Sequence, residues 1–230
     1  MHPYDAFQQK PFPRRRMILE RAADAIGLNR FFLREGKRPH IQADEWTIVS
    51  PSDCKLSEIE ALRPGKDIHG KNAFGRRENY SFEEIVHGDD ASAEFEGGVY
   101  FNMYLSPLNL HYLLYPANLT VKRMEHHPAF CRPILFMRSG EIRNERLVIY
   151  CENSRRTPFI IVLVGSFLVS GVECLADVSG SYEAGGLMGG FKLGSTVLML
   201  FPKGAVEPIA KPGDRLFFGE PMARFQDARS

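Results

Sequence analysis

The chain has 230 residues, of which 44% are hydrophobic and 25% are charged, which is the balance of a globular protein rather than a disordered one. This length is enough to bury a core in one large domain or two small ones. The net charge is +1, so no bulk positive potential favours nucleic acid, and we expect no nucleic-acid partner.

Residues 1–16 predict an extended arm interrupted by prolines, and its sequence ends in a dense basic cluster, Arg14–Arg16. Residues 17–34 carry apolar residues at helical spacing, which suits one amphipathic helix or two short ones. This segment has two interpretations. It is either a peripheral membrane anchor with its arginines on lipid headgroups, or a helix packed on the domain with its arginines in solvent. We assign residues 1–40 to an N-terminal arm and amphipathic helical segment.

From about Trp46 the pattern changes to short β-rich runs that glycine and proline interrupt. The predicted strands lie within Trp46–Pro51, Gly97–Pro107, Arg146–Asn153, Phe159–Val169, Ser195–Pro202 and Arg215–Phe225. Residues 80–87 predict one short helix. The fold class that follows is α+β, mainly β, with a single β-rich domain over residues 41–230 behind the helical N-terminal segment.

Four cysteines are present, and none belongs to a CxxC pair: Cys54, Cys131, Cys151 and Cys174. Their long, irregular gaps argue against a disulfide framework and a zinc site, so we expect reduced thiols and no bound metal. The first residues lack the apolar core of a signal peptide. The most apolar run, Phe159–Val172, has 14 residues and is too short to span a bilayer. We expect a cytoplasmic protein, soluble or peripheral to the membrane.

The strongest chemical signal is Gly194-Ser195-Thr196, which follows a glycine-rich stretch and precedes an apolar run. Taken alone, this pattern is typical of a turn followed by a strand, where Gly-Ser is common. The rest of the chain decides between this interpretation and a chemical one.

Six segments occur in the order in which phosphatidylserine decarboxylases carry them, and the ordered set is specific although each segment is weak alone. They are Trp46–Leu56 with its Pro-x-Asp, Gly75–Gly88 with Tyr-Ser, Gly98–Asn118 with Leu-x-Pro and a histidine, Asn144–Arg146 with Asn-Glu-Arg, the strand Val164–Val172, and the Leu-Gly-Ser-Thr that ends at Thr196. The chain therefore resembles this family over residues 44–222.

The resemblance implies a carboxy-lyase that cleaves its own chain between Gly194 and Ser195. In this family the serine hydroxyl attacks the carbonyl carbon of the preceding glycine, and loss of the serine α-proton then releases the upstream fragment. The implied fragments are residues 1–194 and residues 195–230, the second of which begins with a pyruvoyl group derived from Ser195. That cofactor forms a Schiff base with a substrate amine and accepts electrons when carbon dioxide leaves.

The resemblance also assigns roles to Asp53 and His111. Asp53 matches the family aspartate that helps to activate the serine. His111 matches the first of two family histidines, the one associated with the Schiff-base intermediate. Without the resemblance, Asp53 is typical of a turn and His111 of a structural histidine. We expect Ser195, His111 and Asp53 to be the catalytic residues.

The chain departs from the family pattern in four places. The second family histidine, associated with self-cleavage, falls on Leu114, and the aspartate before the first histidine falls on Asn109. Cys54 replaces a glycine, and we interpret it as a small buried residue because no activating partner is visible. The family glutamate upstream of the cleavage site falls on Leu187 or Met188.

Leucine cannot transfer protons, so the missing second histidine leaves three alternatives open. His111 serves as the base for cleavage, another residue does so, or cleavage is slow or absent. The adjacent pair His126-His127 is a candidate substitute, although a solvated loop is the better interpretation of that segment.

Two functions from different classes follow. The first is a pyruvoyl-dependent decarboxylase of a substrate that bears an amine and a carboxylate, either phosphatidylserine or a small amino acid. The second is an uncleaved, catalytically silent relative that binds a ligand or partner on the same scaffold. Ser195, Asp53 and His111 favour the enzyme, whereas Leu114 and Asn109 favour the silent relative. We predict the enzyme, and a homodimer and peripheral membrane contact stay open.

Overall fold

The computed structural model describes Ala22, residues 25–27, Phe31, Ile41 and residues 44–62, 68–71, 77–86, 93–106, 109–129, 144–165, 172–191 and 195–227. Most of the predicted arm and helix, Cys131 and Gly194 fall outside these residues. The assignment of residues 1–40 to a separate segment therefore stays a prediction.

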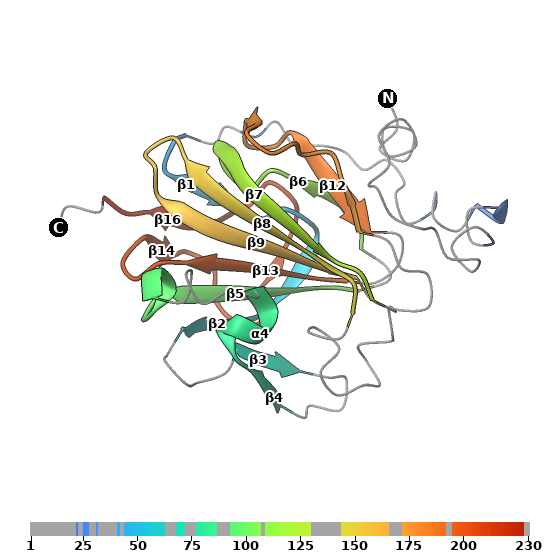
Figure 1. Ribbon diagram of the computed structural model, residues 1–230, viewed down its shortest axis with the longest axis horizontal. Helices are drawn as coiled ribbons and strands as arrows, with labels where there is room; N and C mark the ends of the chain where they lie inside the picture. The colour runs from blue at the N-terminus through green and yellow to red at the C-terminus, as the bar shows by residue number, and fades with distance from the viewer. Residues whose placement is uncertain are drawn as a thin grey trace.

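An antiparallel eight-stranded sheet forms the body of the described chain (Figure 1). In spatial order its strands are β11 (Ser181–Tyr182), β7 (Leu119–His127), β8 (Arg146–Asn153), β9 (Pro158–Gly165), β13 (Ser195–Phe201), β5 (Val99–Leu105), β2 (Cys54–Ala61) and β15 (Arg215–Leu216). β13 pairs with β9 on one side and β5 on the other, and every residue of β13 is buried. A strand covered on both faces needs the continuous apolar run that follows Ser195.

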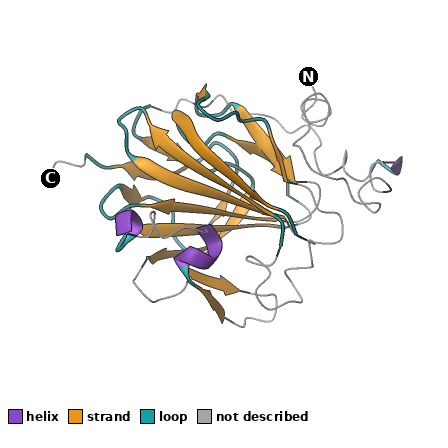
Figure 2. Cartoon of the chain, in the orientation of Figure 1, coloured by secondary structure: helices purple, strands orange, loops and turns teal. Residues whose placement is uncertain are grey.

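Two three-stranded sheets and a hairpin make up the rest of the described β-structure. The first sheet contains β10 (Val172–Cys174), β12 (Leu187–Phe191) and β6 (Tyr112–Leu114); the second contains β1 (Thr47–Val49), β16 (Pro221–Phe225) and β14 (Val206–Pro208); the hairpin joins β3 (Ile68–Lys71) and β4 (Arg77–Tyr80). Strands dominate the drawing (Figure 2). The prediction of an α+β, mainly β fold with a single β-rich domain is confirmed.

Helix α4 (Phe82–Val86) is the short helix predicted over residues 80–87. Ser81 Oγ accepts a hydrogen bond from the Glu84 backbone N–H at 3.1 Å, and Glu84 Oε2 accepts one from the Ser81 N–H at 2.9 Å. This reciprocal capping satisfies two backbone donors at the helix start. At the other end, the buried Arg146 side chain donates to the Ile85 carbonyl at 3.1 Å, which fixes α4 against β8.

The two faces of the eight-stranded sheet bury separate apolar clusters. Val197 and Met199 of β13 belong to the larger cluster, together with residues of β6, β10 and β12. Leu198 and Leu200 point to the opposite face and pack in a second cluster with Ile85 of α4. Side chains alternate along a strand, so odd-numbered positions of β13 face the interior between the eight-stranded sheet and the β10-β12-β6 sheet. We call this space the inter-sheet interior.

The most apolar run of the sequence, residues 159–172, contributes β9 to the centre of the sheet. β9 pairs with β8 and β13, and all but its first residue is buried. The part of the run in β9 is therefore apolar because protein surrounds it. Within the described part of the chain, no helix has the length and apolarity needed to cross a membrane.

Candidate active site

Ser195 is the first residue of the central strand β13. It stands opposite Leu105 of β5 and Gly165 of β9, and its side chain is 1% exposed. By alternation along β13, it points into the inter-sheet interior with Val197. Its Oγ has no hydrogen-bond partner among the residues that the structure describes. A buried hydroxyl without a partner costs about 1–3 kcal/mol, so its presence here asks for a functional reason.

His111 lies immediately before β6 and extends the pairing of that strand. The Phe191 N–H donates to the His111 carbonyl at 2.7 Å, one step beyond the Gly190–Tyr112 pair of β12 and β6. Phe191 belongs to the larger cluster, and residues directly opposite each other on paired strands share a face. This register directs His111, which is fully buried, into the same inter-sheet interior as Ser195. The structure thus brings two of the three predicted catalytic residues to one space.

The hydrogen bonding of His111 defines which ring nitrogen can act as a base. Nδ1 lies 2.9 Å from the backbone carbonyl oxygen of Asn109. A carbonyl only accepts hydrogen bonds, so the proton of the neutral ring is on Nδ1 and the lone pair is on Nε2. Nε2 is therefore the nitrogen that can take a proton from a neighbouring group.

Asp53 occupies the turn that leads into β2. Its Oδ1 accepts a hydrogen bond from the Phe218 backbone N–H at 3.1 Å. Lys55 pairs with Tyr104 of β5, so the register places Asp53 at the same end of the sheet as Ser195, two strands away. Strands two positions apart are separated by roughly 10 Å. At this separation Asp53 does not contact Ser195 directly, so any influence of its carboxylate on Ser195 must pass through a group that lies between them.

Cys54 is the small buried residue that the sequence predicts. Its side chain is 2% exposed, and its sulfur lies 3.6 Å from Ser50 Oγ. Burial raises the pKa of the Cys54 thiol to about 11. The thiolate is therefore scarce near neutral pH, and Cys54 is not a nucleophile. Cys151 and Cys174 are also free and buried.

Comparison with known proteins decides the family. A sequence model of phosphatidylserine decarboxylases matches residues 28–224. This chain belongs to the phosphatidylserine decarboxylase family. Among its relatives, the phosphatidylserine decarboxylase proenzyme of Albidiferax ferrireducens is 33% identical over 85% of this chain and 76% of its own length. Proenzymes of the same name from Polaromonas sp. and Shewanella amazonensis are 30% and 29% identical, over 88% and 86% of this chain and 80% and 78% of their own lengths. The predicted enzyme class, a carboxy-lyase, is confirmed at the level of the family.

Of the three ionisable family positions that this chain lacks, the histidine position is a direct neighbour of one of the two candidate glutamate positions. Leu187 of β12 stands directly opposite Leu114 of β6. Both pack in a small apolar cluster that includes Tyr112 and Phe218, and Leu114 is fully buried. If the glutamate corresponds to Leu187, a histidine and a glutamate that would face each other are replaced by two leucines. The two departures are then one change, from a polar pair to an apolar pair.

The interpretation of His126-His127 as a solvated loop is wrong. These residues form the end of β7, where they pair with Leu147 and Arg146 of β8, and both are half-buried. His126 Nε2 lies 2.9 Å from Glu145 Oε1. β7 is three strands from β13 in the sheet, a separation of roughly 14 Å. Neither histidine is placed to take a proton directly from Ser195.

Asn109 is a site residue whose role the sequence does not reveal. Its side-chain Oδ1 accepts a hydrogen bond from the Ser106 hydroxyl, which closes the loop between β5 and β6. Its carbonyl holds the ring of His111. The second contact is made by the backbone, so no side-chain pattern could have indicated it.

The glycine-rich stretch before Ser195 also has structural reasons. Gly185 has φ = 82°, a backbone conformation that residues with a side chain rarely adopt. At Gly189, a Cβ atom would collide with the carbonyl oxygen of Glu173, so the close pairing of β10 and β12 requires glycine. The backbone conformation at Gly185 and the strand pairing at Gly189 therefore require glycine, whatever the role of the glycine-rich stretch in self-cleavage.

Proposed function

We propose that this chain is a pyruvoyl-dependent decarboxylase that cleaves itself between Gly194 and Ser195 and acts on phosphatidylserine. The observation that carries the proposal is the Ser195 hydroxyl. It is buried, begins the central strand, has no hydrogen-bond partner in the described part of the chain, and points into the space that His111 also faces. The family membership and the names of the relatives support the reaction type and the substrate.

Ser195 fits the precursor of a pyruvoyl group because its hydroxyl has no described structural task. Conversion removes both the hydroxyl and the amide nitrogen of this residue, so an Oγ engaged in the core would be a poor precursor. The group, once formed, supplies a carbonyl that withdraws electrons from a bound substrate amine. It would stand at the start of β13, between β5 and β9.

His111 would act first on Ser195 itself. Nε2 takes the hydroxyl proton as Ser195 Oγ attacks the Gly194 carbonyl carbon, and the Asn109 carbonyl keeps the ring in the tautomer that allows this transfer. Both residues are buried, so little water competes for the ester that results. During turnover the same nitrogen would return a proton to the substrate carbon after carbon dioxide has left. One imidazole can serve both stages because they occur at different times.

Asp53 would support this chemistry from the end of β2. Its carboxylate is held by the Phe218 N–H, so its position is fixed by the turn that follows β15. Strands that lie two apart in a sheet are separated by roughly 10 Å, which is too far for Asp53 to contact Ser195 directly. Asp53 would therefore orient or polarise the group that contacts Ser195.

Intact-mass measurement of the purified protein tests the proposal. Self-cleavage gives two fragments, residues 1–194 and residues 195–230, and the smaller one resists Edman degradation because a pyruvoyl end has no amine. Release of carbon dioxide from phosphatidylserine vesicles, compared with release from free L-serine, tests the substrate. Only full-length chain after prolonged incubation would overturn the proposal and favour a catalytically silent relative. Faster turnover of free serine than of the lipid would replace phosphatidylserine by a small amino acid.

A further inference from the structure

Two cations face each other at the edge of the eight-stranded sheet. Arg215 of β15 stands directly opposite Lys55 of β2, and both side chains are exposed. Like charges in directly opposed positions destabilise a sheet. Among the described residues, neither cation forms an ion pair with a carboxylate. The positive charges of Arg215 and Lys55 therefore repel each other, and no carboxylate among the described residues offsets this repulsion.

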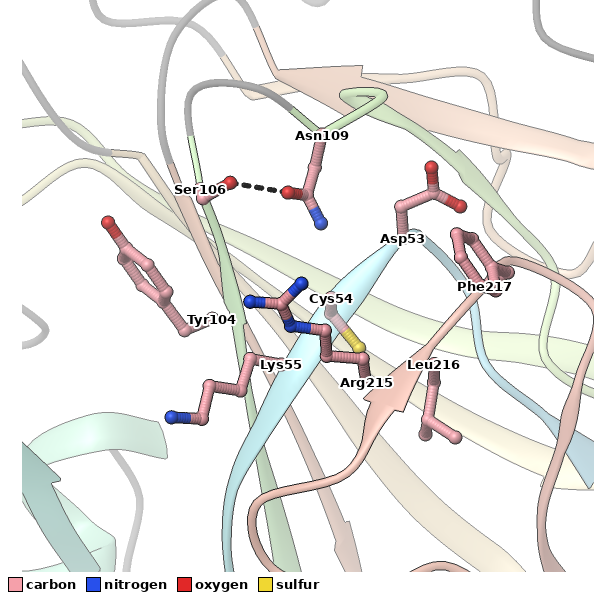
Figure 3. Close-up of a pocket in the computed structure, with 9 residues that line it drawn as sticks. All are labelled: Asp53, Cys54, Lys55, Tyr104, Ser106, Asn109, Arg215, Leu216 and Phe217. Atoms are coloured by element: carbon pink, nitrogen blue, oxygen red, sulfur yellow. Dashed lines mark hydrogen bonds between the residues drawn. The ribbon is translucent and has the colours of Figure 1, made fainter.

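The surroundings of this pair are rich in hydrogen-bond donors. Arg215 and Lys55 line a pocket of about 390 Å³ together with Tyr104, Ser106 and Asn109. Figure 3 shows the guanidinium in the middle of this pocket, beneath the side-chain amide of Asn109. The Ser106 hydroxyl donates to Asn109 Oδ1, so the amide NH2 is the part of Asn109 that is turned toward the guanidinium (Figure 3). The guanidinium and the amide NH2 thus lie together, whereas the Lys55 ammonium extends toward the lower left of the view (Figure 3).

The remaining polar groups are consistent with an anionic occupant. Burial raises the pKa of Tyr104, so its hydroxyl stays protonated and can donate near neutral pH. Asp53 is the one carboxylate among the lining residues, and it lies at the far side of the pocket beside Phe217 and turned away from the guanidinium (Figure 3). Its Oδ1 is already engaged by the Phe218 N–H.

We propose that Arg215 and Lys55 form a subsite for the phosphate ester of the substrate, an inference that rests on the proposed decarboxylase function. The planar guanidinium matches phosphate oxygens in a bidentate manner, and a lysine adds a point charge. The pocket volume suits a headgroup rather than a bare ion. Anion binding would also remove the repulsion between the two cations.

The subsite lies near the end of the sheet at which β13 begins. Tyr104, which lines the pocket, lies on β5 opposite Thr196 of β13. Thr196 is the residue after Ser195, so the pocket starts on the neighbouring strand, next to the position of Ser195 in the sheet. Asn109 belongs to both places, because its side chain lines the pocket and its carbonyl holds His111. Ser195 points to the other face of the sheet, so the amine of a phosphoserine headgroup anchored here would have to pass the ends of β5 and β13, beside Asn109, to reach it.

Binding of inorganic phosphate to the full chain, measured by calorimetry, tests the subsite without any need for catalysis. Arg215→Gln and Lys55→Gln are each expected to weaken phosphate binding by about tenfold, the size of one charge-assisted hydrogen bond. Arg215→Lys should retain part of the affinity. Lys203→Gln is the matched control, since this exposed lysine follows the opposite end of β13 and its loss changes the net charge equally. Equal phosphate affinity in all variants, or no binding to the wild type at millimolar phosphate, overturns the subsite.

Turnover separates the failure of the subsite from the failure of the proposed function. Arg215→Gln should lower kcat/KM for glycerophosphoserine relative to that for free L-serine by about tenfold. A similar loss on phosphatidylserine vesicles supports a site for the phosphate ester itself. If Arg215→Gln lowers kcat/KM only on vesicles, the phosphate subsite is overturned, and Arg215 instead attracts the protein to anionic lipid surfaces in general. If the wild type neither cleaves nor decarboxylates, yet phosphate binding falls in both variants, the proposed function fails and the anion subsite stands.

Discussion

The interior around Ser195 and the edge around Arg215 differ in exposure, polarity and charge, although only the strands β5 and β2 separate β13 from β15. Ser195 and His111 are buried between two sheets, where water is scarce and a hydroxyl stays without a described partner. Arg215 and Lys55 are exposed on the opposite face of the strands that form the sheet edge.

This difference matches two steps with opposite requirements. Conversion of an amide to an ester proceeds best where bulk water does not hydrolyse the ester. One water molecule is then consumed when the dehydroalanine left by elimination becomes the pyruvoyl group and ammonia. Capture of a charged substrate needs groups that solvent, and therefore the substrate, can reach. The molecule places the first set of groups on one side of β5 and the second on the other, with Asn109 in contact with both. The predictions below test this division, from the largest expected effect to the smallest.

Ser195→Ala should abolish self-cleavage, because the attacking oxygen is removed. The free energy of unfolding should rise by about 1–3 kcal/mol relative to the uncleaved wild-type chain, since alanine fills nearly the same volume and removes a buried hydroxyl that makes no described hydrogen bond. The measurements are intact mass and urea denaturation. The control is Ser50→Ala, which removes a buried hydroxyl that donates to the Ser52 carbonyl at 2.8 Å. It should lose about 1 kcal/mol of stability and still be cleaved. A cleaved Ser195→Ala protein would refute the interior chemistry.

His111→Ala should slow carbon dioxide release by about 10²–10⁴-fold, the usual contribution of a positioned acid–base group, and should also slow cleavage. A time course of fragment formation beside a carbon dioxide assay measures both effects. His126→Ala serves as control, because β7 lies three strands from β13. Normal cleavage by His111→Ala without turnover would limit His111 to decarboxylation, and normal activity in both assays would refute its role.

Leu114→His should lower the free energy of unfolding by roughly 3 kcal/mol, because it buries a polar ring in an apolar cluster. Adding Leu187→Glu should recover about 1 kcal/mol, because the two positions are cross-strand partners. Urea denaturation of the single and double variants measures both terms. Additive losses would contradict the pairing. Faster fragment formation in Leu114→His would contradict the assignment of His111 as the base for cleavage.

Cys54 lies where the two regions meet, since it lines the basic pocket while its side chain is buried in the larger cluster. Its pKa is raised from 9.0 to about 11 in the folded protein, so the unfolded chain loses the proton first. Stability is therefore full below pH 9 and falls as the pH rises from 9 to 11, by on the order of 2 kcal/mol from this thiol. Cys54→Ala should flatten that part of the stability profile measured by urea denaturation. An unchanged slope would mean that the thiol is less buried than described.

Much of the fold followed from local patterns. The β-rich runs, the short helix that begins after Ser81 and the burial of Cys54 were predicted correctly, because alternation, capping residues and apolar composition act over a few residues. Strand β7 was not predicted, because most of it, the Lys-Arg-Met-Glu-His-His segment, is polar. Its pairing with β8, rather than its own composition, makes it a strand.

The sequence by itself determined the family, through six motifs in order, and the position of Ser195 at the start of an apolar strand. Only the tertiary structure paired Lys55 with Arg215, Leu114 with Leu187, and the Asn109 carbonyl with the His111 ring. The physical reason is that periodicity fixes which face of a strand a side chain occupies, but sheet order and register fix what stands beside it. Those are set by contacts between segments far apart in the chain, and the chemistry proposed here depends on such neighbours.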